Sequence, residues 1–327
     1  MTITAPPAGA GARQQKRRLG DVWSDRVFRA VALAAGLLVL LILGLITWVM
    51  LSKAWSAFKY QGPSFVTSQH WDPNSNSFGA FAYIFGTLVS SAIALVIAVP
   101  LSLGIALFVT ELAGKRLRTL VTYVIDLLAA IPSVVYGFWA LAVFTKPVQT
   151  FYTHVADTIG KMPLLSRLFG GPASGASFMT AGLILAVMIT PIVTSLSRET
   201  LLTVPQEDKN AALAMGATRL EMLRVAVFPR VRSGLIAAFM LGLGRAMGET
   251  IAVALVIGSS AQVTSHLFRT GDTMASNIAH NFGEAIDLHR SALIGLGVVL
   301  FGITIIVNVI ARVIISRSNR SLWEVVR

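Results

Sequence analysis

Cysteine is absent from all 327 residues of the sequence. This absence excludes disulfide bonds, thiolate metal ligands and cysteine nucleophiles. Charged side chains are also scarce, at 13% of the chain, whereas an average soluble domain has about 25%. Hydrophobic residues make up 55%, and so few charges could not cover the surface of a soluble protein of this length. The composition therefore predicts an integral membrane protein.

The sequence also lacks the pattern Gly-x-x-x-x-Gly-Lys-Ser/Thr, which binds nucleotide phosphates in P-loop ATPases. The chain is therefore not expected to hydrolyse ATP, and we predict neither catalytic residues nor a cofactor. All five histidines fall between the apolar stretches, and none are spaced as i, i+3 or i, i+4 pairs. Because a metal site needs clustered ligands, no metal site is predicted.

Six apolar stretches are long enough to cross a bilayer, which takes about 20 residues in a helix. They lie at 27–51, 80–110, 119–144, 177–202, 233–258 and 291–316. None shows the period-two alternation of a barrel strand, so each is predicted to be a helix. We expect an all-α membrane protein with six transmembrane helices, three of them interrupted by Pro100, Pro132 and Pro191.

Lysine and arginine are distributed unevenly between the two sides of these spans. Nineteen of the 27 fall in the N-terminal tail, the second and fourth connections and the C-terminal end, and seven fall in the other three connections. The positive-inside rule then places both termini in the cytoplasm, with tails at 1–26 and 317–327. The net charge of +12 therefore reflects topology, and no nucleic-acid partner is expected.

The cytoplasmic connection 203–230 begins with signals for a short helix. Thr203 and Gln206 are spaced as a capping box, and a proline stands in the first turn. Gly216 is placed just after the helix, where a positive φ is needed. A plain connection needs only a few residues, so the length of this one favours a docking element over a loop that packs on its own bundle.

A second short helix is predicted after the glycine. Thr218 and Glu221 form a second capping box, and Pro229 is expected to end that helix. The connection is thus predicted to be a helix, a glycine turn and a helix. Ala211 and Ala212 make the first helix thin, which suits close approach to the groove of a partner.

Two charges lie inside the fifth span. A charge at the centre of a bilayer costs at least about 2.5 kcal/mol, so Arg245 and Glu249 should face the bundle interior or a wet cavity. They are four residues apart and are expected to share a helix face. We predict an anion pathway in which Arg245 attracts the substrate and Glu249 holds Arg245 while the path is empty. The alternative is a buried ion pair that only fixes packing.

The cytoplasmic connection resembles the coupling motif of ABC-importer permeases, in which Glu-Ala-Ala is followed by a glycine and, further on, by Ile-x-Leu-Pro. Four residues match the motif: Ala211, Ala212, Gly216 and Pro229. Three positions depart from it: Asn210, Ala226 and Phe228. The resemblance implies a type I ABC-importer permease fold over 80–316, with the loop 203–230 docked into a cleft of an ATPase subunit.

Three further segments resemble the phosphate-specific branch of these permeases, of the PstC type: 130–137, 244–253 and 271–285. The resemblance implies one of two membrane subunits of a phosphate importer in a bacterial plasma (inner) membrane, surrounded by lipid. Its partners would be a PstA-like permease, two PstB-like ATPase subunits and a PstS-like phosphate-binding protein, with inorganic phosphate as substrate. Ser133 and Tyr136 are candidate hydrogen-bond donors along the path, unless they bond their own helix.

Three alternatives remain open at this stage. A permease for another oxyanion, such as sulfate or molybdate, would use the same arginine chemistry. A signalling scaffold would report phosphate status and keep that role when Arg245 is replaced. A passive channel or a proton-coupled carrier would transport without ATP and would have no use for a docking loop.

Overall fold

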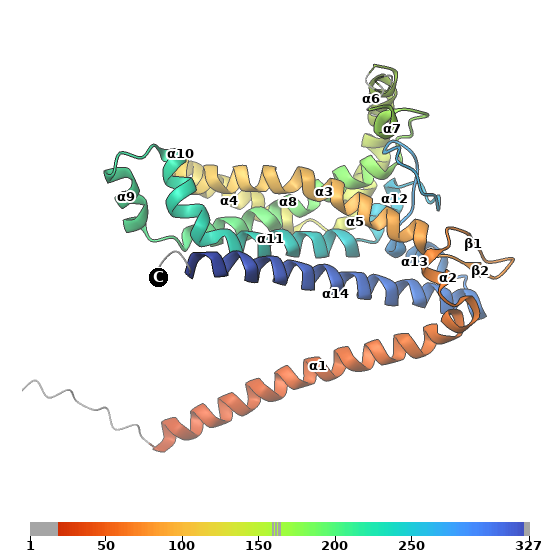
Figure 1. The fold of residues 1–327 in the computed structure, drawn as a ribbon, viewed down its shortest axis with the longest axis horizontal. Helices are drawn as coiled ribbons and strands as arrows, with labels where there is room; N and C mark the ends of the chain where they lie inside the picture. The colour runs from red at the N-terminus through yellow and green to blue at the C-terminus, as the bar shows by residue number, and fades with distance from the viewer. Residues whose placement is uncertain (1–18, 159, 161, 163–164, 324–327) are drawn as a thin grey trace, which may run out of the picture. The chain divides into compact units, whose positions relative to one another are not determined.

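The computed structural model describes residues 19–158, 160, 162 and 165–323. The chain divides into two units, Met1–Val49 and Met50–Arg327, each considered by itself. Within the described residues the elements are helical except for one two-stranded hairpin (Figure 1), in which Trp71 pairs with Phe78. Most of the expected N-terminal tail lies outside the described residues.

The first expected span lies within a much longer helix, α1 (Leu19–Gln61). The apolar residues of its first unit are exposed almost throughout, with Leu40 66% and Trp48 71% accessible. A helix that is apolar on all sides suits a lipid environment. In the second unit the end of α1 packs through Ala57 and Phe58 against a core built around Phe65.

Two long helices form the centre of the second unit, α3 (Phe81–Leu107) and α8 (Phe178–Leu202). α8 is the most deeply buried span and contacts α3, α4, α11 and α12. Gly182 permits the close approach of α8 to α3, because a Cβ there would lie 2.4 Å from Ile93. Pro100 and Pro191 lie inside these helices, which continue through them, so the prediction that these two prolines interrupt their spans was wrong.

The third expected span, 119–144, is interrupted at Pro132, as the sequence predicted. α4 ends at Ala130, and the helical segments that follow leave at an angle of 87°. Pro132 causes the break, because it lacks an N–H and forces Ile131 into an extended conformation with ψ 127°. The segments are α4 (Lys115–Ala130), α5 (Ser133–Trp139), the π-helical η2 (Ala140–Phe144) and α6 (Thr145–Thr158).

The fifth expected span begins in the connection before it and ends early. The helical run 219–248 passes through Pro229 without stopping, which contradicts the prediction that this proline ends a helix. A π-helical turn directly before Pro229 rearranges the backbone hydrogen bonds that a proline would otherwise break. The run comprises α10 (Arg219–Met222), η4 (Leu223–Val227) and α11 (Phe228–Gly248), followed after a gap by α12 (Ile251–Val256).

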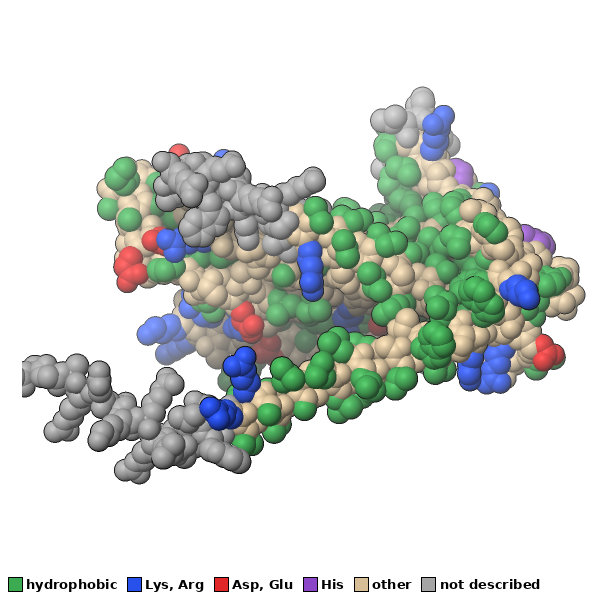
Figure 2. All heavy atoms as spheres, turned by 60° about the horizontal axis from the view of Figure 1, so that its bottom comes forward, with side chains coloured by type: hydrophobic (Ala, Val, Ile, Leu, Met, Phe, Trp, Pro, Cys, Tyr) green, Lys and Arg blue, Asp and Glu red, His purple; other side chains and the backbone are tan. Residues whose placement is uncertain are grey.

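The sixth span is the long helix α14 (Asp287–Trp323). In the described residues five helices are long and apolar enough to cross a membrane, or six if the bent pair counts as one span. The all-α transmembrane architecture is thereby confirmed. Hydrophobic side chains cover much of the helix flanks, and charged ones gather mainly towards the ends (Figure 2). The remaining elements are α2 (Ser64–Thr67), β1 (Trp71–Asp72), β2 (Ser77–Phe78), η1 (Phe108–Leu112), α7 (Ser166–Phe169), α9 (Gln206–Ala214) and α13 (Met274–Asn281).

Candidate functional site

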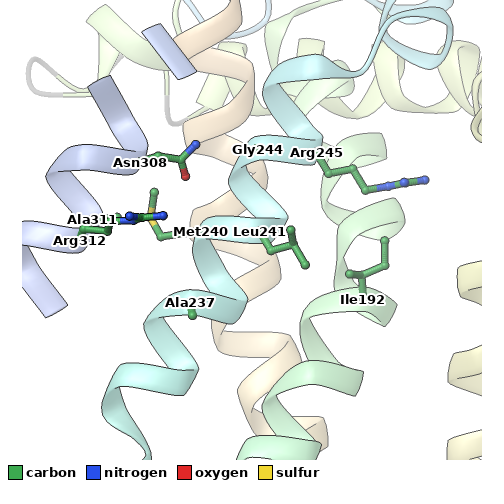
Figure 3. A pocket seen from close by; sticks show the side chains of 9 residues that line it. All are labelled: Ile192, Ala237, Met240, Leu241, Gly244, Arg245, Asn308, Ala311 and Arg312. Carbon is green, nitrogen blue, oxygen red and sulfur yellow. The ribbon is translucent and has the colours of Figure 1, made fainter. Parts of the chain in front are cut away.

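A cavity of about 860 Å³ lies between α8, α11 and α14, and we call it the Arg245 cavity. α11 supplies a stripe of residues at helical spacing, α14 supplies a shorter one, and α8 supplies a single isoleucine (Figure 3). The nine lining residues are Ile192, Ala237, Met240, Leu241, Gly244, Arg245, Asn308, Ala311 and Arg312. The wall is therefore mostly apolar, with one amide and two guanidinium groups.

Arg245 is exposed in the chain and extends from α11 towards the helix that carries Ile192 (Figure 3). None of the described residues that line the cavity is acidic, and neither ion pair found among the described residues involves Arg245. A guanidinium group carries five donors and is always charged. An unpaired guanidinium in an apolar wall is suited to bind an anion with several oxygen atoms.

The described residues show no ion pair between Glu249 and Arg245, although the sequence spacing suggested one. α11 ends at Gly248, and the chain turns after Glu249, whose ψ is 129°. The Oε1 atom of Glu249 accepts the N–H of Ala252 at 3.4 Å, at the first turn of α12. The carboxylate is therefore directed to the start of α12 and is not paired with Arg245.

The glycines of α11 have different roles. Gly242 faces α8, where a Cβ would lie 2.6 Å from Val193. Gly244 lines the Arg245 cavity and has no atom within 4 Å of such a Cβ. One glycine therefore allows α11 to pack closely on α8, and the other keeps the cavity wide beside Arg245.

Ser133 and Tyr136 lie on α5 and are not among the residues that line the Arg245 cavity. The hydroxyl of Tyr136 donates to the carbonyl of Leu128 at 2.8 Å, across the break between α4 and α5. This bond satisfies a carbonyl near the end of α4, where the helical partner is missing. In this structure Tyr136 therefore stabilises the bend, and its hydroxyl proton is engaged there.

The second functional region is the coupling face, which comprises α9, α10 and the turn 215–218 between them. Gly216 has φ +87°, as its position after a helix predicted. The N–H groups of Gly216 and Ala217 donate to the carbonyls of Leu213 and Ala212 at 3.0 and 3.2 Å. These are the two bonds of a Schellman motif, which ends α9 and turns the chain.

The second capping box is present and the first is not. The Thr218 hydroxyl accepts the N–H of Glu221 at 3.4 Å, and the Glu221 carboxylate accepts the N–H of Thr218 at 2.8 Å. The hydrogen bonds from Thr218 also lower the pKa of Glu221. α9 instead begins after Pro205, without a side-chain cap, so the expected role of Thr203 was wrong. The fixed φ of proline suits this position.

Two ion pairs join α9 to different spans. Lys209 Nζ lies 2.5 Å from Glu111 Oε1 in η1, the continuation of α3, and both side chains are largely buried. Arg230 at the start of α11 lies 2.9 Å from Asp208 and is more exposed. Arg118 of α4 donates to the carbonyls of 109 and 110 in η1. The end of α3 is thus connected to both α4 and α9.

The outer surface of the coupling face is apolar at its tip. Met215 is 90% exposed, and Leu213 and Leu220 are also exposed. Of the two motif alanines, Ala211 is exposed and Ala212 is half-buried against the core below. Such a tip, built from short side chains and a few large apolar ones, is suited to insert into a groove.

Sequence reasoning missed four residues in these two regions. Asn308 and Arg312 line the Arg245 cavity, although Arg312 was counted with the C-terminal end. Their spacing of four within an apolar stretch was a usable signal. Lys209 and Glu111 are 98 residues apart, and nothing in the sequence indicated that they form a pair.

The comparisons with known proteins fit this arrangement. Residues 98–320 match the family described as binding-protein-dependent transport system inner membrane component. This match defines the chain as a membrane component of a binding-protein-dependent transport system. The fold is similar to that of a crystallised bacterial alginate ABC importer, with a TM-score of 0.54 and 18% sequence identity. The match covers 90% of this chain and 98% of that one. That likeness concerns the fold.

Relatives in sequence are more specific. The phosphate transport system permease protein PstC of Xylella fastidiosa (Temecula1) is 45% identical over 93% of this chain and 94% of its own. PstC of Haemophilus influenzae is 39% identical over 94% of this chain and 98% of its own. PstC 2 of Mycobacterium tuberculosis is 39% identical over 89% and 91%. The chain belongs to the PstC family of transport permeases.

Proposed function

We propose that this protein is the PstC-type permease subunit of an ATP-driven phosphate importer in a bacterial inner membrane. It would form half of the translocation path beside a PstA-like permease. Two PstB-like ATPase subunits would bind below, and a PstS-like protein would deliver phosphate from outside. Both termini would face the cytoplasm, as the distribution of basic residues favours. The name shared by the relatives supports phosphate as the substrate.

The observation that carries the proposal is that Arg245 has no ion-pair partner, and its cavity no acidic lining residue, in the part of the chain that the structure describes. Phosphate is a small dianion or monoanion whose oxygens fit the planar fork of a guanidinium. A carboxylate in the cavity would neutralise the arginine and repel the substrate. Glu249 accepts a hydrogen bond at the first turn of α12 and leaves Arg245 available.

The coupling face supplies the second part of the mechanism. Its exposed apolar tip would dock into a cleft of the ATPase subunit, where the family motif residues Ala211, Ala212 and Gly216 lie. Lys209 and Asp208 connect that tip to the ends of α3 and α11. Closure of the ATPase pair would therefore move α9 and, with it, two spans, of which α11 lines the Arg245 cavity. Pro229 lies where α10 continues into α11, so the movement reaches the Arg245 cavity through one helical run.

The test is reconstitution of the complete importer in liposomes, followed by uptake of labelled phosphate with and without ATP and the binding protein. Uptake should require both and should be lost in Arg245→Gln at normal assembly. Arg116→Gln is the matched control, because it removes an exposed arginine of α4 that does not line the cavity. Uptake without ATP, or full uptake by Arg245→Gln, would contradict the proposal.

The same preparation separates the alternatives. Sulfate or molybdate in excess should leave phosphate uptake unchanged if the permease is phosphate-specific. In cells, Arg245→Gln should lose uptake, and retained repression of phosphate-starvation genes would reveal a signalling role that does not depend on transport.

A further inference from the structure

The Arg245 cavity is lined by a second basic residue, Arg312 of α14. We propose that Arg312, together with Asn308, forms a second oxyanion site on α14, which receives phosphate after Arg245 on its way to the cytoplasm. The inference rests on the proposed function, because it assigns a direction to transport. It adds a binding site to the path that Arg245 begins.

The geometry of two antiparallel helices places the sites in order. α11 runs away from the coupling face and α14 runs back towards it (Figure 1). Asn308 lies level with Gly244 and Arg245, whereas Arg312 lies level with Met240 (Figure 3). Four residues of helix correspond to about 6 Å. Arg312 is therefore about one helical turn closer to the coupling face than Arg245.

The two arginines reach into different parts of the cavity. Arg245 extends away from α14, towards the side of Ile192, and Arg312 extends from α14 towards Met240 of α11 (Figure 3). A single small anion in one position would not bind both guanidinium groups in this arrangement. Two successive positions, joined by the open space at Gly244, fit the side-chain directions better.

Electrostatics favours an anion at Arg312. The described residues provide no ion-pair partner for Arg312, and no carboxylate lines the cavity. Arg312 lies in the apolar stretch 291–316 of α14, where no described acidic residue compensates its charge. Asn308, one turn away on the same stripe, adds a neutral amide donor. A cation and an amide in an otherwise apolar wall can exchange water for the oxygens of a phosphate group.

Phosphate oxygens near α14 could belong to inorganic phosphate or to a lipid headgroup, since the two share the same chemistry. A basic residue near the end of a span often reaches the headgroup layer. Continuity with Arg245 in one cavity favours inorganic phosphate here. The experiment must therefore vary the substrate and the lipid separately.

The experiment uses the complete importer in liposomes of phosphatidylcholine, with initial rates of labelled inorganic phosphate uptake at several concentrations. Arg312→Gln should lower the maximal rate by about tenfold, the effect expected when a charge-assisted hydrogen bond is lost. Arg312→Lys, which keeps the charge, should recover most of the rate. Asn308→Leu should reduce the rate less than Arg312→Gln does.

Arg116→Gln is the matched control, because it removes an exposed arginine of α4 near the same side of the bundle. Equal rates for Arg312→Gln and Arg116→Gln would overturn the proposal. A defect that appears only when anionic lipid is added would assign Arg312 to lipid binding and would also overturn it. Loss of assembled complex in both Arg312→Gln and Arg312→Lys would show a structural role instead. Absence of ATP-dependent uptake in the unmodified importer would reject the proposed function itself, separately from the second site.

Discussion

Charged residues are arranged in opposite ways in two regions of this molecule, the coupling face and the Arg245 cavity. At the coupling face Lys209 and Asp208 each have an ion-pair partner on another element. In the Arg245 cavity two arginines have none among the described residues, and the wall around them is apolar. Paired charges fix the position of one element against another. Unpaired charges at a cavity leave their hydrogen-bonding capacity for a ligand.

The largest effect on transport is expected when Arg245 is given an acidic partner. Leu241 lines the cavity one turn before Arg245, so Leu241→Glu places a carboxylate at i, i+4 spacing on the same helix. The acid would pair with Arg245 and repel phosphate, and like-charge contacts cost several kcal/mol, so uptake should fall by about 100-fold. The measurement is ATP-dependent phosphate uptake by the reconstituted importer.

Leu241→Gln is the control for this substitution, because it has a similar shape and no charge. If Leu241→Glu and Leu241→Gln transport equally, Arg245 does not act as an anion site.

Next in size is the loss of a pair at the coupling face. Lys209→Met leaves Glu111 largely buried without its cation, which should cost about 3 kcal/mol. The importer should then hydrolyse more ATP for each phosphate transported, because α9 moves less firmly with α3. The exchanged variant Lys209→Glu/Glu111→Lys should recover much of that ratio. If the single variants at Lys209 and Glu111 leave the ratio of ATP hydrolysed to phosphate transported unchanged, the pair does not transmit movement.

Asp272 lies in the connection before α13, where its carboxyl group is buried without an ion-pair partner among the described residues. Burial raises the pKa of Asp272 to about 6, against an ordinary value of 3.8, while Ser276 and the N–H of Thr273 oppose the rise. The folded state therefore binds this proton more tightly, and its stability should fall as the pH rises from about 4 to about 6. Asp272→Asn removes the charge and keeps an acceptor for Thr273, so it should raise stability at pH 7.5 by on the order of 2 kcal/mol. Apparent Tm values at pH 5 and 7.5 should differ less in the variant; an unchanged difference would contradict the assignment.

A smaller effect is expected at the turn of the coupling face. Gly216→Ala forces a left-handed conformation on a residue with a Cβ, at a cost of about 1 kcal/mol. Open space surrounds the position, so no clash adds to this cost. The apparent Tm of the purified chain should fall slightly, and Gly216→Asn should lie between glycine and alanine. A large loss of uptake with an unchanged Tm would place Gly216 in direct contact with a partner.

The smallest effect should follow removal of the exposed pair. Asp208→Asn breaks the contact with Arg230, whose side chain is 58% accessible. Exposed ion pairs contribute less than about 1 kcal/mol, so stability should change little. A drop as large as that of Lys209→Met would show that exposure does not separate the two pairs.

Much of the architecture could be predicted because it depends on local chemistry. Hydropathy placed one span at 177–202, and α8 occupies Phe178–Leu202. The capping box of Thr218 and the turn at Gly216 follow from residues a few positions apart. The break at Pro132 followed from the proline itself. The end of α11 before Glu249 escaped the same reasoning, because an apolar composition does not reveal whether the chain keeps its direction.

The functional regions were predictable only in part, for a related reason. Arg245 is conspicuous in the sequence as a charge within an apolar span. Arg312 and the pair of Lys209 with Glu111 acquire meaning only when distant segments meet. The roles of Arg245, Ser133 and Tyr136 in transport remain predictions.

The helix α11 has a mechanical consequence. About 26 Å of helix, at 1.5 Å per residue, separates its start at Phe228 from Arg245. If α11 tilts as one rod about its coupling end, a rotation of about 7° displaces Arg245 by about 3 Å, close to the length of a hydrogen bond. A small motion of an attached ATPase would thus be sufficient to make or break the contact of the guanidinium group with its anion.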